Sequence, residues 1–89
     1  MTADDMIEAM QARGFTVYGR SISPNSTNVR RVFDFPDAHT SYPYVVVNTP
    51  AIGAPTYKYV QLLNNEDYYG PDDDHYEFFM KYIAPYPVL

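Results

Sequence analysis

Four short runs of β-branched and aromatic residues follow one another closely between residues 15 and 63, and their spacing limits the folds open to this chain. The runs cover residues 15–22, 29–35, 44–47 and 56–63, and turn-forming segments rich in proline, serine and asparagine separate them. These segments are shorter than the dozen or so residues that a crossover between parallel strands requires. The pattern therefore predicts a mostly antiparallel sheet of three or four strands.

The composition of each run predicts its place in that sheet. The third run is apolar on both faces, which is typical of a central strand covered on each side. The fourth run places Val60 and Leu62 on one face and Tyr59 on the other. In the second run the alternation slips at Arg30 and Arg31, which indicates a β-bulge or an edge position.

Helical patterns lie on both sides of these runs. Residues 2–13 have apolar side chains at helical spacing, a capping residue at Thr2 and a stop signal at Gly14. Residues 74–84 have a second such pattern, which Pro85 ends, and the last residues are expected to leave as an extended tail. We therefore expect an α+β fold in the order α-β-β-β-β-α. Residues 1–89 should form a single compact domain, because a chain this short can build only one core.

The periodicity also predicts which side chains are buried. In the second helix Tyr76, Phe79, Met80 and Ile83 recur on one face, which we expect to cover the sheet. Phe78 and Tyr82 widen the apolar surface beyond that face, and we expect them to form a second interface with a partner or another copy of the chain. The predicted core consists of Met10, Val46, Val60, Leu62, Phe79 and Ile83.

The charge balance excludes several classes of function. The net charge is −5, with eleven carboxylates against six lysines and arginines, so direct binding of nucleic acid is not expected. The absence of cysteine excludes disulfides and thiolate zinc sites. No apolar run approaches the roughly 18 residues that span a bilayer, and the first residues are acidic where a secretory signal is basic. We therefore expect a cytoplasmic protein without membrane contact.

Residues 64–79 hold six of the eleven carboxylates and contain no lysine or arginine. Asp74 and Glu77 fit a capping box at the start of the second helix. Asp72, Asp74 and His75 are residue types that bind metals, but tyrosines stand where a calcium loop needs its early ligands. We therefore expect neither a metal nor another cofactor, and interpret the remaining carboxylates as a solvated surface or a binding feature.

Two further patterns bear on catalysis. Asp37, His39 and Ser41 are the residue types of a catalytic triad, but real triads draw their members from separate elements, and a polar loop explains these residues better. The chain also lacks the glycine-rich motifs that bind phosphates. We expect that the protein is not an enzyme.

Tyrosine is the most unusual feature of the composition. Ten tyrosines without a tryptophan exceed what a core of this size can absorb, because each buried hydroxyl needs a hydrogen-bond partner. Exposed tyrosines are frequent hot spots of protein interfaces. The acidic stretch combines such rings with carboxylates, and the predicted partner-binding residues are Glu66, Asp67, Tyr68, Tyr69, Asp72 and Asp73.

These features predict a protein partner with a basic surface. A compact acidic domain can occupy a groove that normally holds nucleic acid, with carboxylates in place of phosphates and rings in place of bases. In size and charge the chain resembles the small proteins by which phages and mobile elements block host defence nucleases, anti-restriction and anti-CRISPR proteins among them. This resemblance implies an inhibitor that acts in the host cytoplasm. The alternative is a homodimeric structural domain, or one that holds a small ligand with tyrosines and His39 or His75.

Overall fold

The computed structural model describes residues 1–22, 28–37, 44–50, 59–62 and 67–89. Its elements are α1 (Ala3–Ala12), β1 (Thr16–Ile22), β2 (Asn28–Asp34), β3 (Tyr44–Pro50), β4 (Tyr59–Leu62), β5 (Asp67–Tyr69) and α2 (His75–Tyr82). The strands form one antiparallel sheet in which each strand pairs with its neighbours in sequence. The predicted α+β class is confirmed: along the chain, one helix precedes the strands of the antiparallel sheet and one helix follows them.

The fifth strand was not predicted from the sequence. β5 lies within the acidic stretch, where Asp67 pairs with Leu62 and Tyr69 pairs with Val60 of β4. A segment of three residues has little strand preference of its own, and it is extended because β4 offers it a ladder of hydrogen-bond partners. The acidic stretch thus supplies part of the sheet.

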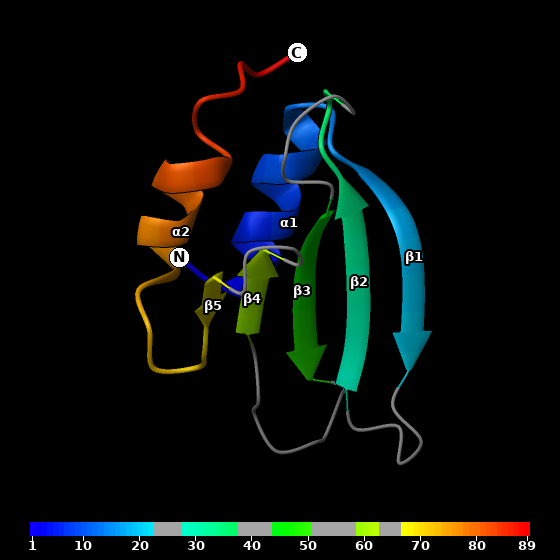
Figure 1. Ribbon diagram of the computed structural model, residues 1–89, viewed down its shortest axis with the longest axis vertical. Coiled ribbons are helices and arrows are strands. Elements are labelled where there is room, and N and C mark those ends of the chain that lie inside the picture. Colours follow the sequence, from blue (N-terminus) through cyan, green and yellow to red (C-terminus); the bar gives the residue numbers. More distant parts are fainter. Residues whose placement is uncertain (23–27, 38–43, 51–58, 63–66) are drawn as a thin grey trace.

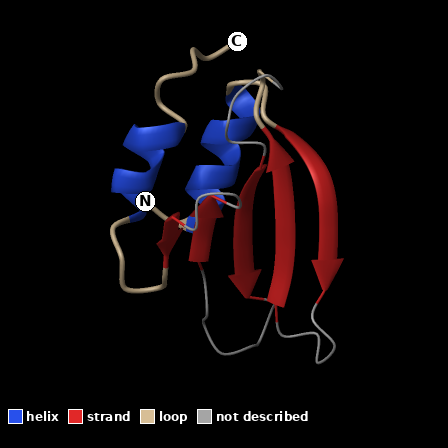
Figure 2. Cartoon of the chain, in the orientation of Figure 1, coloured by secondary structure: helices blue, strands red, loops and turns tan. Residues whose placement is uncertain are grey.

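Both helices pack on the same face of the sheet (Figures 1 and 2). Apolar side chains from the helices and from alternate strand positions meet in one core between the two layers. The buried members of this core are Ala3, Met6, Met10, Phe15, Phe33, Phe35, Val45, Val47, Val60, Leu62, Tyr69, Phe78 and Ile83. No described helix or strand covers the opposite face of the sheet, which we call the open face.

Most of the predicted core is confirmed. Fully buried among the predicted residues are Met10, Val46, Val60, Leu62 and Ile83. Val46 nevertheless belongs to the open face, where it lies between Val32 and Gln61 of the flanking strands. The sixth predicted residue, Phe79, is only half-buried.

The buried face of α2 therefore differs from the prediction. Phe78 is fully buried and its ring makes an edge contact with Tyr69, at 5.5 Å between centroids. Tyr76 and Met80 are 52% and 50% exposed. Apolar residues occupy most positions of this helix, so several faces fit the periodicity, and the contact with β5 decides between them.

The same contacts correct the expectation of a second interface at Phe78 and Tyr82. Phe78 has no exposed surface. Tyr82 is half-buried against the core, and its hydroxyl donates a hydrogen bond to the carboxylate of Asp67. Phe78 and Tyr82 are thus used inside the molecule, whereas Tyr76 and Met80 are the apolar residues of this helix that remain exposed.

The sequence predicted a β-bulge or an edge position for the second strand, β2, but the bulge lies in the neighbouring strand β1. β2 runs in regular register against β3, whereas β1 contains a bulge between Val17 and Gly19. Arg31 remains on the helix-side face opposite Val47, and its guanidinium donates to Thr49 Oγ1 at 2.9 Å. This hydrogen bond satisfies a partly buried arginine without a break in β2.

α1 begins and ends as predicted. Thr2 and Asp5 form a capping box, and Gly14 follows the helix with a φ of +90°, in the left-handed region. The tail after α2 does not leave the domain, because the Leu89 N–H donates to the Ala12 carbonyl at 3.0 Å. The chain end is thus attached to the C-terminal end of α1.

We expect Gly14→Ala to lower the free energy of unfolding by about 1–2 kcal/mol, the cost of a left-handed conformation in a residue with a side chain. A Cβ at Gly14 would also lie 3.1 Å from Leu89 Cδ1. Gly19→Ala is a matched control, since a Cβ at that position meets no atom within 4 Å. Thermal unfolding of both variants measures the difference, and equal melting temperatures would show that the conformation of Gly14 is not required.

Candidate binding surface on the open face

The open face of the sheet presents four tyrosines. Tyr44, Tyr59 and Tyr68 share this face with Val46, and Tyr18 lies in the bulge of β1. The rings of Tyr18 and Tyr44 are 4.8 Å apart between centroids, and those of Tyr59 and Tyr68 are 5.1 Å apart. The face therefore carries one aromatic pair near each edge of the sheet, with the buried side chains of Val46 and Asn48 between the pairs.

The pair near β5 lies beside carboxylates. Tyr68 is 43% exposed. A Cβ at Gly70 would be 3.4 Å from Tyr68 Cε1 and 3.6 Å from Asp73 Oδ2, so this glycine lets the ring and the carboxylate lie close together. Asp73 accepts the Gly70 N–H at 2.6 Å, and Asp72 is exposed next to it. We call Tyr59, Tyr68, Asp72 and Asp73 the acidic end of the open face.

Only part of the predicted partner-binding set lies at the acidic end. Tyr68, Asp72 and Asp73 are there, whereas Glu66 lies outside the described residues. Asp67 and Tyr69 are directed to the helix side instead, where Asp67 contacts α2 and Tyr69 is buried against it. The alternation of β5 explains this division, because Tyr68 must face away from its two neighbours.

Asp67 and Tyr69 join β5 to α2 through Lys81. The Lys81 ammonium lies 3.4 Å from Asp67 Oδ2 and donates to the Tyr69 hydroxyl at 3.1 Å. The hydrogen bond with Tyr69, together with the Asp67 carboxylate, raises the pKa of Lys81 above its ordinary value. Through these contacts Asp67 and Tyr69 stabilise the packing of α2 against β5.

Asp74 caps α2 as predicted, but the contacts described for this helix contain only this half of the predicted capping box with Glu77. The Asp74 carboxylate accepts the Tyr76 N–H at 2.9 Å, and Glu77 lies in the first turn, where the helix dipole favours negative charge. Next to the cap, His75 is buried and its Nε2 lies 2.9 Å from the Gly70 carbonyl oxygen. The acidic stretch thus contains strand β5, the turn at Gly70, the helix cap at Asp74 and the exposed carboxylate of Asp72.

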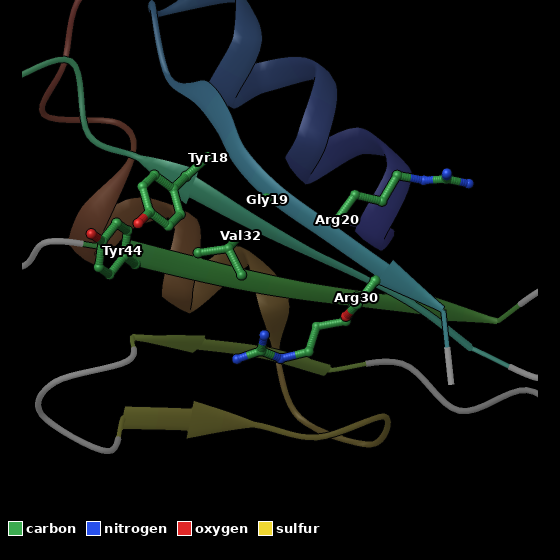
Figure 3. Close-up of a pocket in the computed structure, with 7 residues that line it drawn as sticks. Tyr18, Gly19, Arg20, Arg30, Val32 and Tyr44 are labelled. Carbon is green, nitrogen blue, oxygen red and sulfur yellow. The ribbon is translucent and has the colours of Figure 1, made fainter. Parts of the chain in front are cut away.

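A hollow of about 350 Å³ lies at the opposite end of the open face (Figure 3). Gly19 and Val32 form its floor, the Tyr18–Tyr44 ring pair stands at one end and Arg30 lies at the other. The hollow exists because Gly19 has no side chain, and a Cβ there would enter open space. Tyr18 is 66% exposed, so its ring forms a wall that solvent reaches. We call this region the basic end of the open face.

The basic end contains Arg30, and the carboxylate of Asp34 lies on the same face opposite Tyr44. Arg30 lies on the open face, whereas Arg20 lies on the helix side and points away from Arg30 in Figure 3. No described residue forms an ion pair or hydrogen bond with either side chain. Hydrogen bonding with the Tyr18 hydroxyl raises the pKa of Tyr44 above its ordinary value, so this phenol stays neutral at physiological pH. The two ends of the open face can therefore attract groups of opposite charge.

The described part of the chain contains no group of three or more histidines, aspartates or glutamates placed to hold a metal ion. Of the triad-like residues, Asp37 is exposed, while His39 and Ser41 lie outside the described residues. Within the same described ranges, no helix is long and apolar enough to cross a membrane.

Comparison with known protein families, with curated proteins and with solved structures found no match to this chain. The four open-face tyrosines were not predicted as one surface. The alternation of Tyr59 with Val60 did indicate a tyrosine on the outer face of β4, and that assignment is confirmed. The pairing of Tyr18 with Tyr44 depends on the bulge in β1, which Gly19 could have indicated, because an isolated glycine within a strand often marks a bulge.

Proposed function

We propose that this protein is a protein-binding module that contacts a partner with a basic surface through the acidic end of its open face. The observation that supports this proposal is the Tyr59–Tyr68 ring pair, tilted by 34° at 5.1 Å between centroids, beside Asp72 and Asp73. Tyrosine rings supply large contact area at low conformational cost, and adjacent carboxylates accelerate the encounter with a basic partner.

The same arrangement supports an inhibitory role. Exposed aromatic rings next to carboxylates combine flat apolar surface with negative charge, as bases and phosphates do, so the acidic end can occupy a groove in which a nucleic-acid-binding protein holds its ligand. Within this proposal the protein acts in the cytoplasm of a host cell, as anti-restriction and anti-CRISPR proteins do. Nucleic acid should then compete with the protein for its partner.

The test begins with the partner captured from native cells by the tagged protein, after nuclease treatment, and identified by mass spectrometry. Tyr68→Ala should weaken binding to that partner by about 2 kcal/mol, or about thirtyfold, mainly through faster dissociation. Asp72→Lys should slow association and flatten its dependence on salt. Surface plasmon resonance separates the two effects.

Tyr76→Ala is the matched control, because Tyr76 is a tyrosine of similar exposure on the outer side of α2. It should leave the affinity unchanged. Parental affinity of Tyr68→Ala, or failure of added duplex or single-stranded nucleic acid to displace the protein, would count against the proposal. A stable dimer that Tyr68→Ala converts to a monomer would support the self-assembling alternative instead.

A further inference from the structure

The second inference concerns β1, which is an edge strand of the sheet. Among the described strands β1 pairs only with β2, so alternate backbone N–H and C=O groups along its other side point away from the sheet. β1 has seven residues, of which six are exposed, whereas the opposite edge strand β5 has only three residues. A long open edge of this kind can pair with an additional strand.

The bulge limits where such pairing can occur. Register between β1 and β2 shifts between Val17 and Gly19, and it is regular from Gly19 to Ile22. An added strand would therefore follow the segment from Gly19 onward. Gly19 and Arg20 are the first residues of this segment. Because they are neighbours in a strand, they lie on opposite faces of the sheet, Gly19 on the open face and Arg20 on the helix side.

The two faces of this segment favour different side chains. On the open face Gly19 leaves the hollow between Arg30 and the Tyr18–Tyr44 pair, which can hold a large apolar or aromatic side chain from a residue opposite the glycine. On the helix side Arg20 is exposed and no described carboxylate pairs with it. A carboxylate opposite Arg20 would supply that partner.

A second copy of β1 does not fit this edge. In an antiparallel pair of two identical strands the two-fold axis lies near the middle of the strand, close to residue 19. Arg20 would then lie within about two positions of its own copy, and like charges placed this close destabilise a strand pair. The charge of the edge instead complements an acidic segment.

We propose that the β1 edge binds, as a strand parallel to β1, an extended segment of another protein in which an aromatic or large apolar residue is followed by aspartate or glutamate. The segment adds a sixth strand to the sheet, its apolar side chain enters the hollow beside Gly19, and its carboxylate pairs with Arg20. This proposal concerns the basic end and does not rest on the function proposed for the acidic end.

Two synthetic peptides of about eight residues, the length of an ordinary strand, provide the test. Both alternate threonine and valine, and they differ only in a central Phe-Glu or Phe-Lys pair. Fluorescence polarisation with the intact protein should show at least about tenfold tighter binding of the Phe-Glu peptide. Amide hydrogen exchange followed by NMR should show new protection along residues 19–22 of β1.

Arg20→Glu should reverse this preference, so that the Phe-Lys peptide binds more tightly. Gly19→Leu should weaken both peptides by about tenfold, because the new side chain occupies the hollow. Asp72→Lys, a charge reversal at the other end of the open face, should leave the preference intact. Circular dichroism confirms that each variant is folded.

Equal affinity for the two peptides, or no saturable binding of the Phe-Glu peptide up to millimolar concentration, would overturn the proposal. Protection at residues outside β1 would overturn it as well. Loss of partner capture in Tyr68→Ala does not bear on these results, so the two proposals can fail separately.

Discussion

Phe78→Ala is expected to lower the free energy of unfolding by about 3 to 5 kcal/mol, because truncation leaves a large cavity at a fully buried site. The ring of Phe78 contacts those of Tyr69 and Tyr82, at centroid separations of 5.5 and 4.8 Å. Its loss therefore weakens the packing of α2 on the sheet as well as the core itself. Since a whole domain is stable by only about 5–15 kcal/mol, much of the folded population should be lost on mild heating.

Two variants on the same helix calibrate this result. Phe79→Ala should be clearly less destabilising, because Phe79 is half-buried, and Met80→Ala should change stability by less than about 0.5 kcal/mol at an exposed position. Urea unfolding followed by circular dichroism gives all three values. A larger effect of Phe79→Ala than of Phe78→Ala would restore the helix phase predicted from periodicity.

Asp67→Ala is expected to lower the free energy of unfolding by about 2 kcal/mol, through loss of the hydrogen bond from the Tyr82 hydroxyl to a charged acceptor. The ion pair with Lys81 adds little, because Lys81 is largely exposed. For a domain of this size the change corresponds to a fall of roughly 8–16 °C in melting temperature. A carboxylate that only steers a partner would show no such effect.

Asp72→Ala is the matched control for Asp67→Ala. It removes a carboxylate of the same stretch at an exposed position, and should change stability by no more than about 0.5 kcal/mol. Differential scanning calorimetry of the two variants gives their melting temperatures. It thereby shows whether the Asp67 carboxylate stabilises the fold and the Asp72 carboxylate does not. Equal melting temperatures would indicate that Asp67 belongs to the solvated surface after all.

The fold could be predicted where several local signals in the sequence agree. α1 has a capping residue, helical spacing and a stop glycine that all agree, and the short connections between strands leave only antiparallel pairing. β5 could not be predicted, because its strand conformation comes from pairing with β4. The phase of α2 depends in turn on β5, so one missed strand also displaced the predicted core from Phe78 to Phe79.

The candidate site was predictable in composition but not in arrangement. The excess of tyrosine and the acidic stretch both pointed to Tyr68 and Asp73, which do lie side by side. The position of Asp67 on the helix side follows only from the register of β5. Contacts across strands, such as that between Tyr18 and Tyr44, depend on a register that the sequence does not display.

The alternation that separates the two faces of the sheet also separates two kinds of evolutionary constraint. Along β3, Val45 and Val47 are held by the packing of the helices, while side chains on the open face have no helix to accommodate. Substitutions at exposed positions such as Tyr18 and Tyr68 can therefore change what the surface recognises with little effect on folding. A lineage could redirect such a protein to a new target through a few changes on one face, while its core stayed the same.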